Sequence, residues 1–521
     1  MSSLSIPAPK PHFPAEIDKH LAEYTIKIAS EEQKKAHFEA CWEMPNWPGQ
    51  LNRENRTNGR WMVKQFAKFF ESHYKGDWSK DRGPLHWALV RRDDPEGEPY
   101  SFIVTLRRRC FIKQQQHDIK RGWYYAITEV ITPLRHRRKG YATHLCRLLH
   151  YVLASPRPEL DCPSLSGVTI TTSSKQLGPF TQSDPSSIAL PPFPAKWGAP
   201  PAAIPNELAG HIPQANGSLL WSDIDIAFYG RCTVGLDQPG WCSAPEENYK
   251  LVWALRPVNL ESDNQTASDF DRNINATWEP IHSDTLPGVR RLLSRAVQSK
   301  LRKCQPGSGG VYTADPASPG ALNYIDDKGR SVPPPDWLDE SKVIPYGFRL
   351  RRSVKHDVAQ ALSDDCHSQS VKEAERNHKG EDEVGEVDVD GDYDGNDDAI
   401  VMVALRNYQV GPRLLITYIH NLHPEDLSSL LVTLDRLVTE HNAPCSEAEC
   451  WSLNPDVRDD AQLIQRWKEL EERDAKVEIR QGLRSHVLGY CWYGDEGVAS
   501  WNEEGKETRI KMADTQLWNW V

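Results

Sequence analysis

The sequence predicts an α/β protein of the α+β type, in which a mixed and mostly antiparallel sheet is flanked by helices. A second, C-terminal domain of related but degenerate topology is expected to follow. Apolar runs of period two, interspersed with stripes of helical period, predict the first sheet and its helices. A basic turn at 135–140 joins the longest β-rich run to a striped helix. The C-terminal third repeats the order strand, strand, helix, strand without a second turn of this kind.

Length and charge limit the class of protein. At 521 residues the chain exceeds what one hydrophobic core usually serves, so we expect two or three domains. A net charge of −11 argues against bulk nucleic-acid binding. No stretch approaches the roughly 18 uncharged apolar residues of a membrane span, and the N-terminus has no basic region followed by an apolar one. We therefore expect no nucleic-acid or membrane partner and a cytoplasmic or nuclear address.

The cysteines give no sign of a metal or disulfide framework. Eleven cysteines form no CxxC pair, and the nearest approach, Cys445 and Cys450, has no matching Cys/His cluster. The sequence therefore predicts neither disulfides nor a bound metal.

The first domain is expected over 21–256, after a flexible N-terminus over 1–20. Its predicted strands are 22–29, 84–90, 100–106, 122–131, 218–222 and 246–255. Its predicted helices are 31–41, 61–74, a helix that follows Ala142, and the short segment 224–231. Proline accumulates over 155–215, which predicts a disordered insertion with strand character only at 168–172.

A linker over 257–335 and a second domain over 336–521 complete the chain. The linker carries a basic amphipathic helix at 286–303, for which a solvated face on a packing helix is the ordinary explanation and a membrane-surface or calmodulin-type role the alternative. The second domain is expected to contain strands at 342–350, 400–405, 414–419, 443–453 and 486–493, and helices at 427–440 and 461–473. A disordered acidic loop over 363–398 interrupts it, and Glu381–Asp398 suits either a solvated insertion or the docking of a basic partner.

The basic turn has the features of a phosphate-binding turn. Gly140 lacks a Cβ, so a phosphate oxygen can approach the backbone, and the N–H groups that open the next helix point at the anion with the helix dipole behind them. A basic helix cap and a nuclear-localisation cluster are the alternative interpretations.

Two motifs resemble those of a known superfamily. The spacing Arg137-x-x-Gly140-x-Ala142 resembles the acyl-CoA pyrophosphate loop of the GNAT N-acetyltransferases. Residues 222–229, with Gly240-Trp241 beyond them, are similar to the second GNAT signature, a strand and short helix carrying a Tyr before a Gly-aromatic pair. About ten residues separate Tyr229 from Gly240, where the family usually has only a few, so the end of this helix departs from the pattern.

The resemblance implies acetyl-CoA as co-substrate and assigns a donor site. Main-chain amides from Arg138 to Ala142 would bind the pyrophosphate, and strand 129–131 would pair with pantetheine and direct one N–H at the thioester oxygen. The implied donor-binding residues are Val130, Ile131, Arg137, Arg138, Lys139, Gly140, Tyr141 and Ala142.

Two catalytic residues are implied in the same way. Tyr229 matches the general-acid tyrosine of the family, and its phenol, with a pKa near about 10, can protonate a leaving thiolate. A core aromatic beside Phe228 is the alternative. Glu129 is the candidate base, with Asp223 and Asp225 as alternatives that also suit the capping of the short helix.

The acceptor is indicated only by a closer resemblance. The run Thr132–Ala142, the segment Leu220–Asp223 with Tyr229, and the basic helix resemble the fungal lysine acetyltransferase family. This resemblance implies transfer of acetyl to the side-chain amine of free lysine. Two other functions stay open: a catalytically silent CoA-binding or scaffold protein, and a protein N-acetyltransferase whose basic polypeptide substrate is attracted by the acidic loop.

Overall fold

Two mostly antiparallel sheets flanked by helices make up the molecule, which confirms the predicted fold class. The computed structural model describes residues 19–43, 76, 78–79, 83–114, 119–156, 190–243, 249–256, 277–304, 310–330, 337, 339, 341–352, 398–408, 411–451, 453, 455, 458–470, 473–480, 486–493 and 511–512. The predicted helix 61–74, the segment 168–172 and nearly all of the acidic loop lie outside these residues. None of the described helices combines the length and low charge needed to cross a bilayer.

The first sheet runs in the order β1-β2-β3-β4-β5-β15-β6, with β9 beside β3 and β16 beside β9. Its strands are β1 (Tyr24–Ile28), β2 (Pro84–Arg91), β3 (Ser101–Lys113), β4 (Lys120–Ile131), β5 (Gly217–Ser222), β6 (Cys242–Ser243), β9 (Val311–Ala314), β15 (Val487–Trp492) and β16 (Lys511–Met512). All pairs are antiparallel except β4 with β5 and β16 with β9. The sheet is therefore mixed, as predicted.

Helices cover the two faces of this sheet. The apolar stripe of α5 (Tyr141–Ala154) packs on the face that carries Tyr125 and Ile127. Helix α2 (Glu31–Trp42), which starts at a capping box between Ser30 and Gln33, packs against Phe102. Neighbouring residues of a strand point to opposite faces of the sheet. The buried residues packed with α2 and those packed with α5 therefore lie on opposite faces.

The second sheet runs in the order β14-β7-β13-β12-β11-β10-β8. Its strands are β7 (Tyr249–Ala254), β8 (Trp278–Ile281), β10 (Gly347–Leu350), β11 (Ala399–Tyr408), β12 (Gly411–His420), β13 (Glu447–Trp451) and β14 (Lys476–Ile479). Helices α10 (Leu427–Glu440) and α11 (Arg458–Glu469) bury their apolar stripes on one face of it. The bounds predicted for α10 are those observed.

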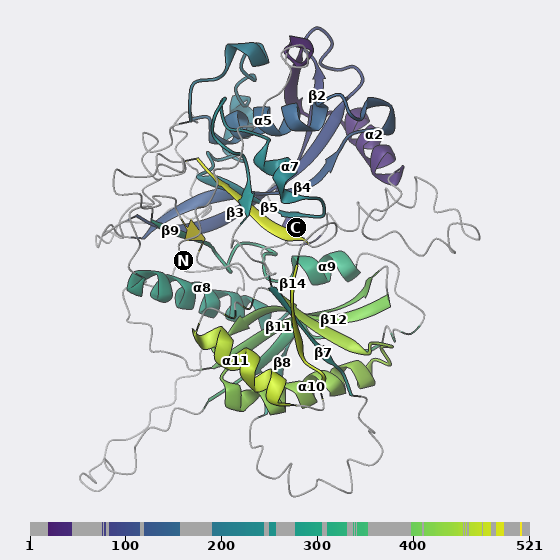
Figure 1. The fold of residues 1–521 in the computed structure, drawn as a ribbon, viewed down its shortest axis with the longest axis vertical. Helices are drawn as coiled ribbons and strands as arrows, with labels where there is room; N and C mark the ends of the chain where they lie inside the picture. The colour runs from purple at the N-terminus through teal and green to yellow at the C-terminus, as the bar shows by residue number, and fades with distance from the viewer. Residues whose placement is uncertain are drawn as a thin grey trace, which may run out of the picture.

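The region expected to be a linker is instead part of the core between the sheets. Helix α8 (Leu286–Lys303) and helix α9 (Tyr324–Arg330) lie between the two sheets, and their apolar residues share one buried cluster with both (Figure 1). The apolar stripe of α8 is buried because it faces this cluster, while its basic residues stay outside. The basic helix thus has the ordinary role of a packing helix.

Each sheet contains a strand from the other half of the chain. Chain order places 249–254 in the first domain, but β7 pairs with β13 and β14 of the second sheet. Conversely, β15 pairs with β5 and β6 of the first sheet, where it is seen as the yellow strand in the upper part of Figure 1. The expected assignment of both strands by chain order is corrected by these hydrogen bonds.

The C-terminal part of the Pro-rich insertion is folded, contrary to the expectation of disorder. Over 190–215 the chain forms short turns of helix at Ala195–Trp197 and Asn206–Ala209. Trp197 and Ile212 are buried, and Tyr151 of α5 packs edge-on against Phe193 at 4.9 Å. Large apolar residues among the prolines supply the contacts that order this segment.

Candidate functional site

Strands β4 and β5 pair over only part of their lengths. Their parallel ladder runs from Tyr124 opposite Gly217 to Ile127 opposite Leu220. Beyond this point β4 continues to Ile131 with β3 as its only described strand partner, while β5 continues beside β15. Among the described residues the facing edges of β4 and β5 are therefore not paired with each other beyond Ile127 and Leu220, a break in the ladder of the kind that an additional extended chain can fill.

A bulge in β4 lies at the start of this divergence. The register against β3 shifts between Phe102 and Val104, and Glu129 has a left-handed φ of 53°. Such a backbone is costly for a residue with a Cβ and is typically retained where function or packing requires it. The bulge places Glu129 at the same point at which β4 leaves β5.

The turn after β4 presents backbone N–H groups at the start of α5. A short 3₁₀ helix, Leu134–His136, is followed by Arg138 with φ 61° and Gly140 with φ 82°. Among the described residues no side chain caps α5, so its first N–H groups have no intrahelical or side-chain acceptor. With the helix dipole behind them, they form a site for an anion.

An aromatic cluster holds this turn against β1. The Tyr141 hydroxyl lies 3.0 Å from the Tyr24 hydroxyl and 2.9 Å from His20 Nε2, and the Tyr100 ring packs 5.1 Å from that of Tyr141. Burial, together with the hydrogen bond to Tyr141, raises the pKa of Tyr24 to about 12. Both phenols therefore stay neutral and fix the first residue of α5 without adding negative charge near the turn.

The charges around the turn leave its tip basic. Glu98 accepts from Arg135 Nε at 2.6 Å and lies 2.9 Å from His136 Nε2, and these contacts, His136 first, lower the Glu98 pKa. Arg138 and Lys139 are exposed at the tip. One acidic residue thus anchors the base of the turn, while exposed cations remain beside the N–H groups of α5.

The altered spacing after Tyr229 is accommodated by a compact turn. Helix α7 (Ile226–Gly230) begins where Asp225 accepts a hydrogen bond from the Ala227 N–H at 2.9 Å. The additional residues then fold back through a bridge between Val234 and Gln238. The Trp241 N–H donates to the Tyr229 carbonyl at 3.2 Å, so the Gly-aromatic pair returns to the tyrosine despite the longer loop.

Tyr229 is packed on the α5 side of the first sheet. Only 9% of it is exposed, and its ring lies 5.0 Å from Phe228 and 6.0 Å from Trp241. Burial raises the pKa of Tyr229 well above its ordinary value, with nearby thiols of Cys146 and Cys232 adding to the effect. The phenol is therefore protonated at neutral pH.

The three carboxylates considered as bases are in different settings. Glu129 is buried against α2, with its Oε2 3.9 Å from His37 Nε2. Asp223 forms an ion pair with His486, and Asp225 caps α7. Glu129 alone lies on β4 at the divergence. Sequence reasoning missed His37, whose only signal was its position on the buried face of a predicted helix.

The second sheet repeats the divergence of strands. Parallel pairing of β12 with β13 ends at Ile416 opposite Cys450, and β12 continues to His420. A register shift against β11 between Met402 and Val403 marks a bulge at the same point. A 3₁₀ helix, Pro424–Asp426, then leads directly into α10.

The residue that precedes α10 is engaged by other groups of the chain, although no side chain caps this helix either. Asp426 accepts from the His423 N–H at 3.1 Å and forms an ion pair with Arg352. The four residues that correspond to Arg137–Gly140 are missing, because α10 starts immediately after its 3₁₀ helix. No equivalent anion site is therefore formed by the described residues of this half.

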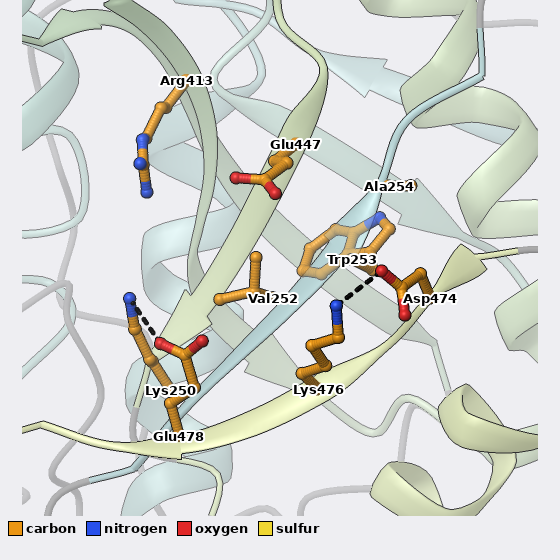
Figure 2. Close-up of a pocket in the computed structure, with 9 residues that line it drawn as sticks. All are labelled: Lys250, Val252, Trp253, Ala254, Arg413, Glu447, Asp474, Lys476 and Glu478. Atoms are coloured by element: carbon orange, nitrogen blue, oxygen red, sulfur yellow. Dashed lines mark hydrogen bonds and ion pairs between the residues drawn. The ribbon is translucent and has the colours of Figure 1, made fainter. Parts of the chain in front are cut away.

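A polar hollow on the second sheet is lined by charges that neutralise one another. Figure 2 shows Lys250 paired with Glu478 at 2.9 Å and Lys476 paired with Asp474 at 2.6 Å. The hollow is also lined by Val252, Trp253, Ala254, Arg413 and Glu447. Arg413 and Glu447 lie one residue before Leu414 and Ala448, where the pairing of β12 with β13 begins. The hollow therefore lies at the opposite end of these strands from their divergence.

Comparisons with known proteins give remote structural neighbours. No protein-family model and no curated protein sequence matches the chain. The chain is similar to a GCN5-related N-acetyltransferase from Anabaena variabilis, with 10% identity, 91% of this chain and 74% of that chain covered, and a TM-score of 0.39. It is also similar to a GCN5-related N-acetyltransferase from Kribbella flavida, with 9% identity, coverage of 90% and 71%, and a TM-score of 0.36. Such low scores decide neither activity nor acceptor, and they do not favour the fungal lysine acetyltransferases over other families.

Proposed function

We propose that this protein is an acetyl-CoA-dependent N-acetyltransferase that uses the first sheet as its donor site. One observation carries the proposal: the diverging edges of β4 and β5 and the uncapped, basic start of α5 follow each other directly in the chain. An extended acyl-pantetheine chain suits the free edge of β4, and a pyrophosphate suits the turn. Adjacent parts of the fold thus match the acyl-pantetheine chain and the pyrophosphate of one acetyl-CoA molecule.

The donor would be bound largely by main-chain groups. The N–H groups from Arg138 to Ala142 would bind the pyrophosphate, with charge added by Arg137, Arg138 and Lys139. Val130 and Ile131 would pair with the pantetheine, and one N–H of this stretch would donate to the thioester oxygen as negative charge develops there. Gly140 and Tyr141 fix the path of the turn.

The proton transfers are assigned to two residues on opposite faces of the sheet. Tyr229, on the α5 face, would protonate the departing thiolate. Glu129, on the α2 face, would accept a proton from the incoming ammonium, directly or through water. The acceptor would then approach β4 from the side of α2 and the second sheet.

The proposed acceptor is a primary amine, and specifically the side-chain amine of free lysine, in the cytoplasm. Support for lysine comes from the resemblance of the run 132–142 and of the segment around Tyr229. A basic polypeptide bound through the acidic loop is the competing acceptor. Acetyl-CoA supplied with free amino acids, polyamines or basic peptides, with thiol release as the readout, distinguishes them.

A matched pair of variants tests the donor site. Gly140→Asp places a carboxylate among the N–H groups of α5, whereas Ser428→Asp adds the same charge to the first turn of α10. We expect Gly140→Asp to raise the KM for acetyl-CoA at least about tenfold and Ser428→Asp to leave it unchanged. The reason is that the proposed phosphate site is at the start of α5 and not at the start of α10. Equal KM values for both variants and the wild type would refute this donor site.

A further inference from the structure

Helix α2 and the bulge of β4 bring three kinds of metal ligand together inside the molecule. Ligand atoms of His37, Cys41 and Glu129 all lie within 4.8 Å of one another. His37 and Cys41 are four positions apart on α2, so both project from one helix face toward β4. Both are fully buried, and Glu129 is 8% exposed.

One nitrogen of the His37 ring faces this cluster, while the other contacts His86. His37 Nε2 is buried and makes no hydrogen bond with any described residue. The nearest carboxylate oxygen, Glu129 Oε2, is 3.9 Å away. Buried polar atoms are nearly always satisfied, so this gap suggests a bound group between the two. Two ligand atoms on one tetrahedral zinc are about 3.3 Å apart, which requires only a small closure.

The surroundings of His37 suit a metal ligand. Its Nδ1 lies 3.1 Å from His86 Nδ1, and a single proton shared by these atoms can reside on His37. In that tautomer Nε2 carries the lone pair, and His86 acts as the outer hydrogen-bond partner that metal-bound histidines usually have. The Phe102 ring stacks on His37 at 4.8 Å and fixes its plane. Burial lowers the pKa of His37 to about 3, against an opposing contribution from the Glu129 backbone, so the ring is neutral.

We propose that His37, Cys41 and Glu129 bind one zinc ion, with water as the fourth ligand. A mixed nitrogen, sulfur and oxygen set favours zinc over magnesium or calcium, which prefer oxygen alone. Cys41 binds as the thiolate and releases its proton to solvent. The proposal departs from the expectation of no metal. The sequence signal was His37-x3-Cys41 on one helix, which becomes a site only when β4 adds Glu129.

The zinc site does not rest on the proposed function, but it shares Glu129 with the proposed acyl-transfer machinery. Ligation through Oε2 leaves Glu129 Oε1 free of the metal, so the glutamate can hold zinc and still face the divergence of β4. The ion would connect α2 to the bulge and hold both in place. A metal-free protein with acyl-transfer activity would refute only the zinc site. A zinc-loaded protein without acyl-transfer activity would refute only the function proposed above.

Metal analysis of the full chain, purified without chelators, tests the site. We expect about one zinc per chain by mass spectrometry, and after exchange with cobalt a thiolate-to-cobalt absorption band in the near ultraviolet. Cys41→Ser should abolish the band and reduce zinc at least tenfold, and His37→Gln should reduce zinc similarly. Cys146→Ser, which changes a buried cysteine on α5, is the matched control and should retain both the bound zinc and the thiolate-to-cobalt band.

The wild-type protein alone can overturn the proposal. Less than a tenth of an equivalent of zinc, both as purified and after dialysis against zinc, would do so, and so would a cobalt derivative without a thiolate band. Equal zinc in wild type, Cys41→Ser and His37→Gln would also contradict it. Because the first two outcomes need no variant, a variant that fails to fold does not prevent a decision.

Discussion

The two sheets of this chain carry the same break in strand pairing but different turns after it. In each sheet a parallel pair separates at a bulge, and a helix of 14 residues follows a 3₁₀ helix. In the first half four residues, Arg137–Gly140, lie between the two helices and leave the start of α5 uncapped. In the second half α10 follows its 3₁₀ helix directly and is also without a side-chain cap, and its N-cap residue Asp426 forms an ion pair with Arg352.

The difference teaches that the fold alone does not make a donor site. Both halves contain a break in strand pairing and a helix start without a side-chain cap. The first half places the exposed Arg138 and Lys139 beside that start, whereas the second half places the buried carboxylate of Asp426 there. The proposed donor site thus depends on four residues of turn, while the scaffold around them is shared.

The largest effect is expected from removing the proposed acid of the first half, because this change should affect catalysis and not folding. Tyr229→Phe removes the proposed acid and keeps the ring packed against Trp241, so kcat should fall by about 10²-fold or more. The affinity for CoA and the melting temperature should stay near wild type. Steady-state kinetics with calorimetric CoA titration measures both, and unchanged turnover would remove the acid role.

The next effect tests whether the two halves are thermodynamically separate. Leu488 of β15 and Leu251 of β7 are buried in the sheet of the opposite half. Either one replaced by Ala should lower the free energy of unfolding by about 2–5 kcal/mol, and both sheets should still unfold in one transition. Urea titrations followed by tryptophan fluorescence and by circular dichroism would measure the loss of stability and show whether there is one transition.

Val432→Ala, at a more exposed position on α10, is the control for these two leucines and should change stability by less than about 0.5 kcal/mol. Two separate transitions in either leucine variant would show that the exchanged strands do not couple the sheets.

A smaller effect is expected at Asp426, which lies at the start of α10 in the position that corresponds to the proposed phosphate site of the first half. Asp426→Ala removes the acceptor of the His423 N–H and leaves Arg352 without its partner, so stability should fall by about 1–2 kcal/mol. CoA affinity should not change, because the donor binds elsewhere. Thermal denaturation with and without CoA measures both quantities. A weakened CoA complex would show that the second half contributes to the site.

The smallest effect concerns the contact of α5 with the C-terminal strand. Burial lowers the pKa of His150 to about 3, and its ring lies 3.1 Å from the Tyr493 hydroxyl and 3.0 Å from the Cys232 carbonyl. Below about pH 6.5 the unfolded chain binds a proton that the native ring does not. The stability contributed by neutral His150 is therefore present above that pH and is lost as the pH falls, by about 1 kcal/mol between pH 7 and 5.5.

His150→Gln lacks this titration, so the stability difference between wild type and variant should narrow by that amount over the same range. Denaturant titrations at the two pH values test it. A constant difference would mean that the native ring is protonated as readily as the unfolded one.

The parts of the molecule that depend on local pattern were predicted well. The bounds of α10 follow from its apolar stripe, and the turn at Gly140 follows from a strand, a proline and a helix in succession. The exchange of β7 and β15 could not be predicted, because both strands have the same pattern in either sheet and only long-range pairing decides between them.

The candidate site shows the same limit. The proposed phosphate turn is contiguous in sequence and is therefore accessible to sequence reasoning, whereas His37 and Glu129 meet only because β4 bulges beneath α2. The folded end of the insertion was missed because its few apolar residues, such as Trp197, are recognisable as core only once α5 is present.

The exchange of strands also sets an order of events during synthesis. The β5 edge of the first sheet stays open until β15, almost the last described strand, has left the ribosome, since Ser222 pairs with Val487. An open edge in a nascent chain is prone to pair with the wrong strand. The half that carries the proposed donor site is therefore expected to complete its sheet only after β15 has been synthesised.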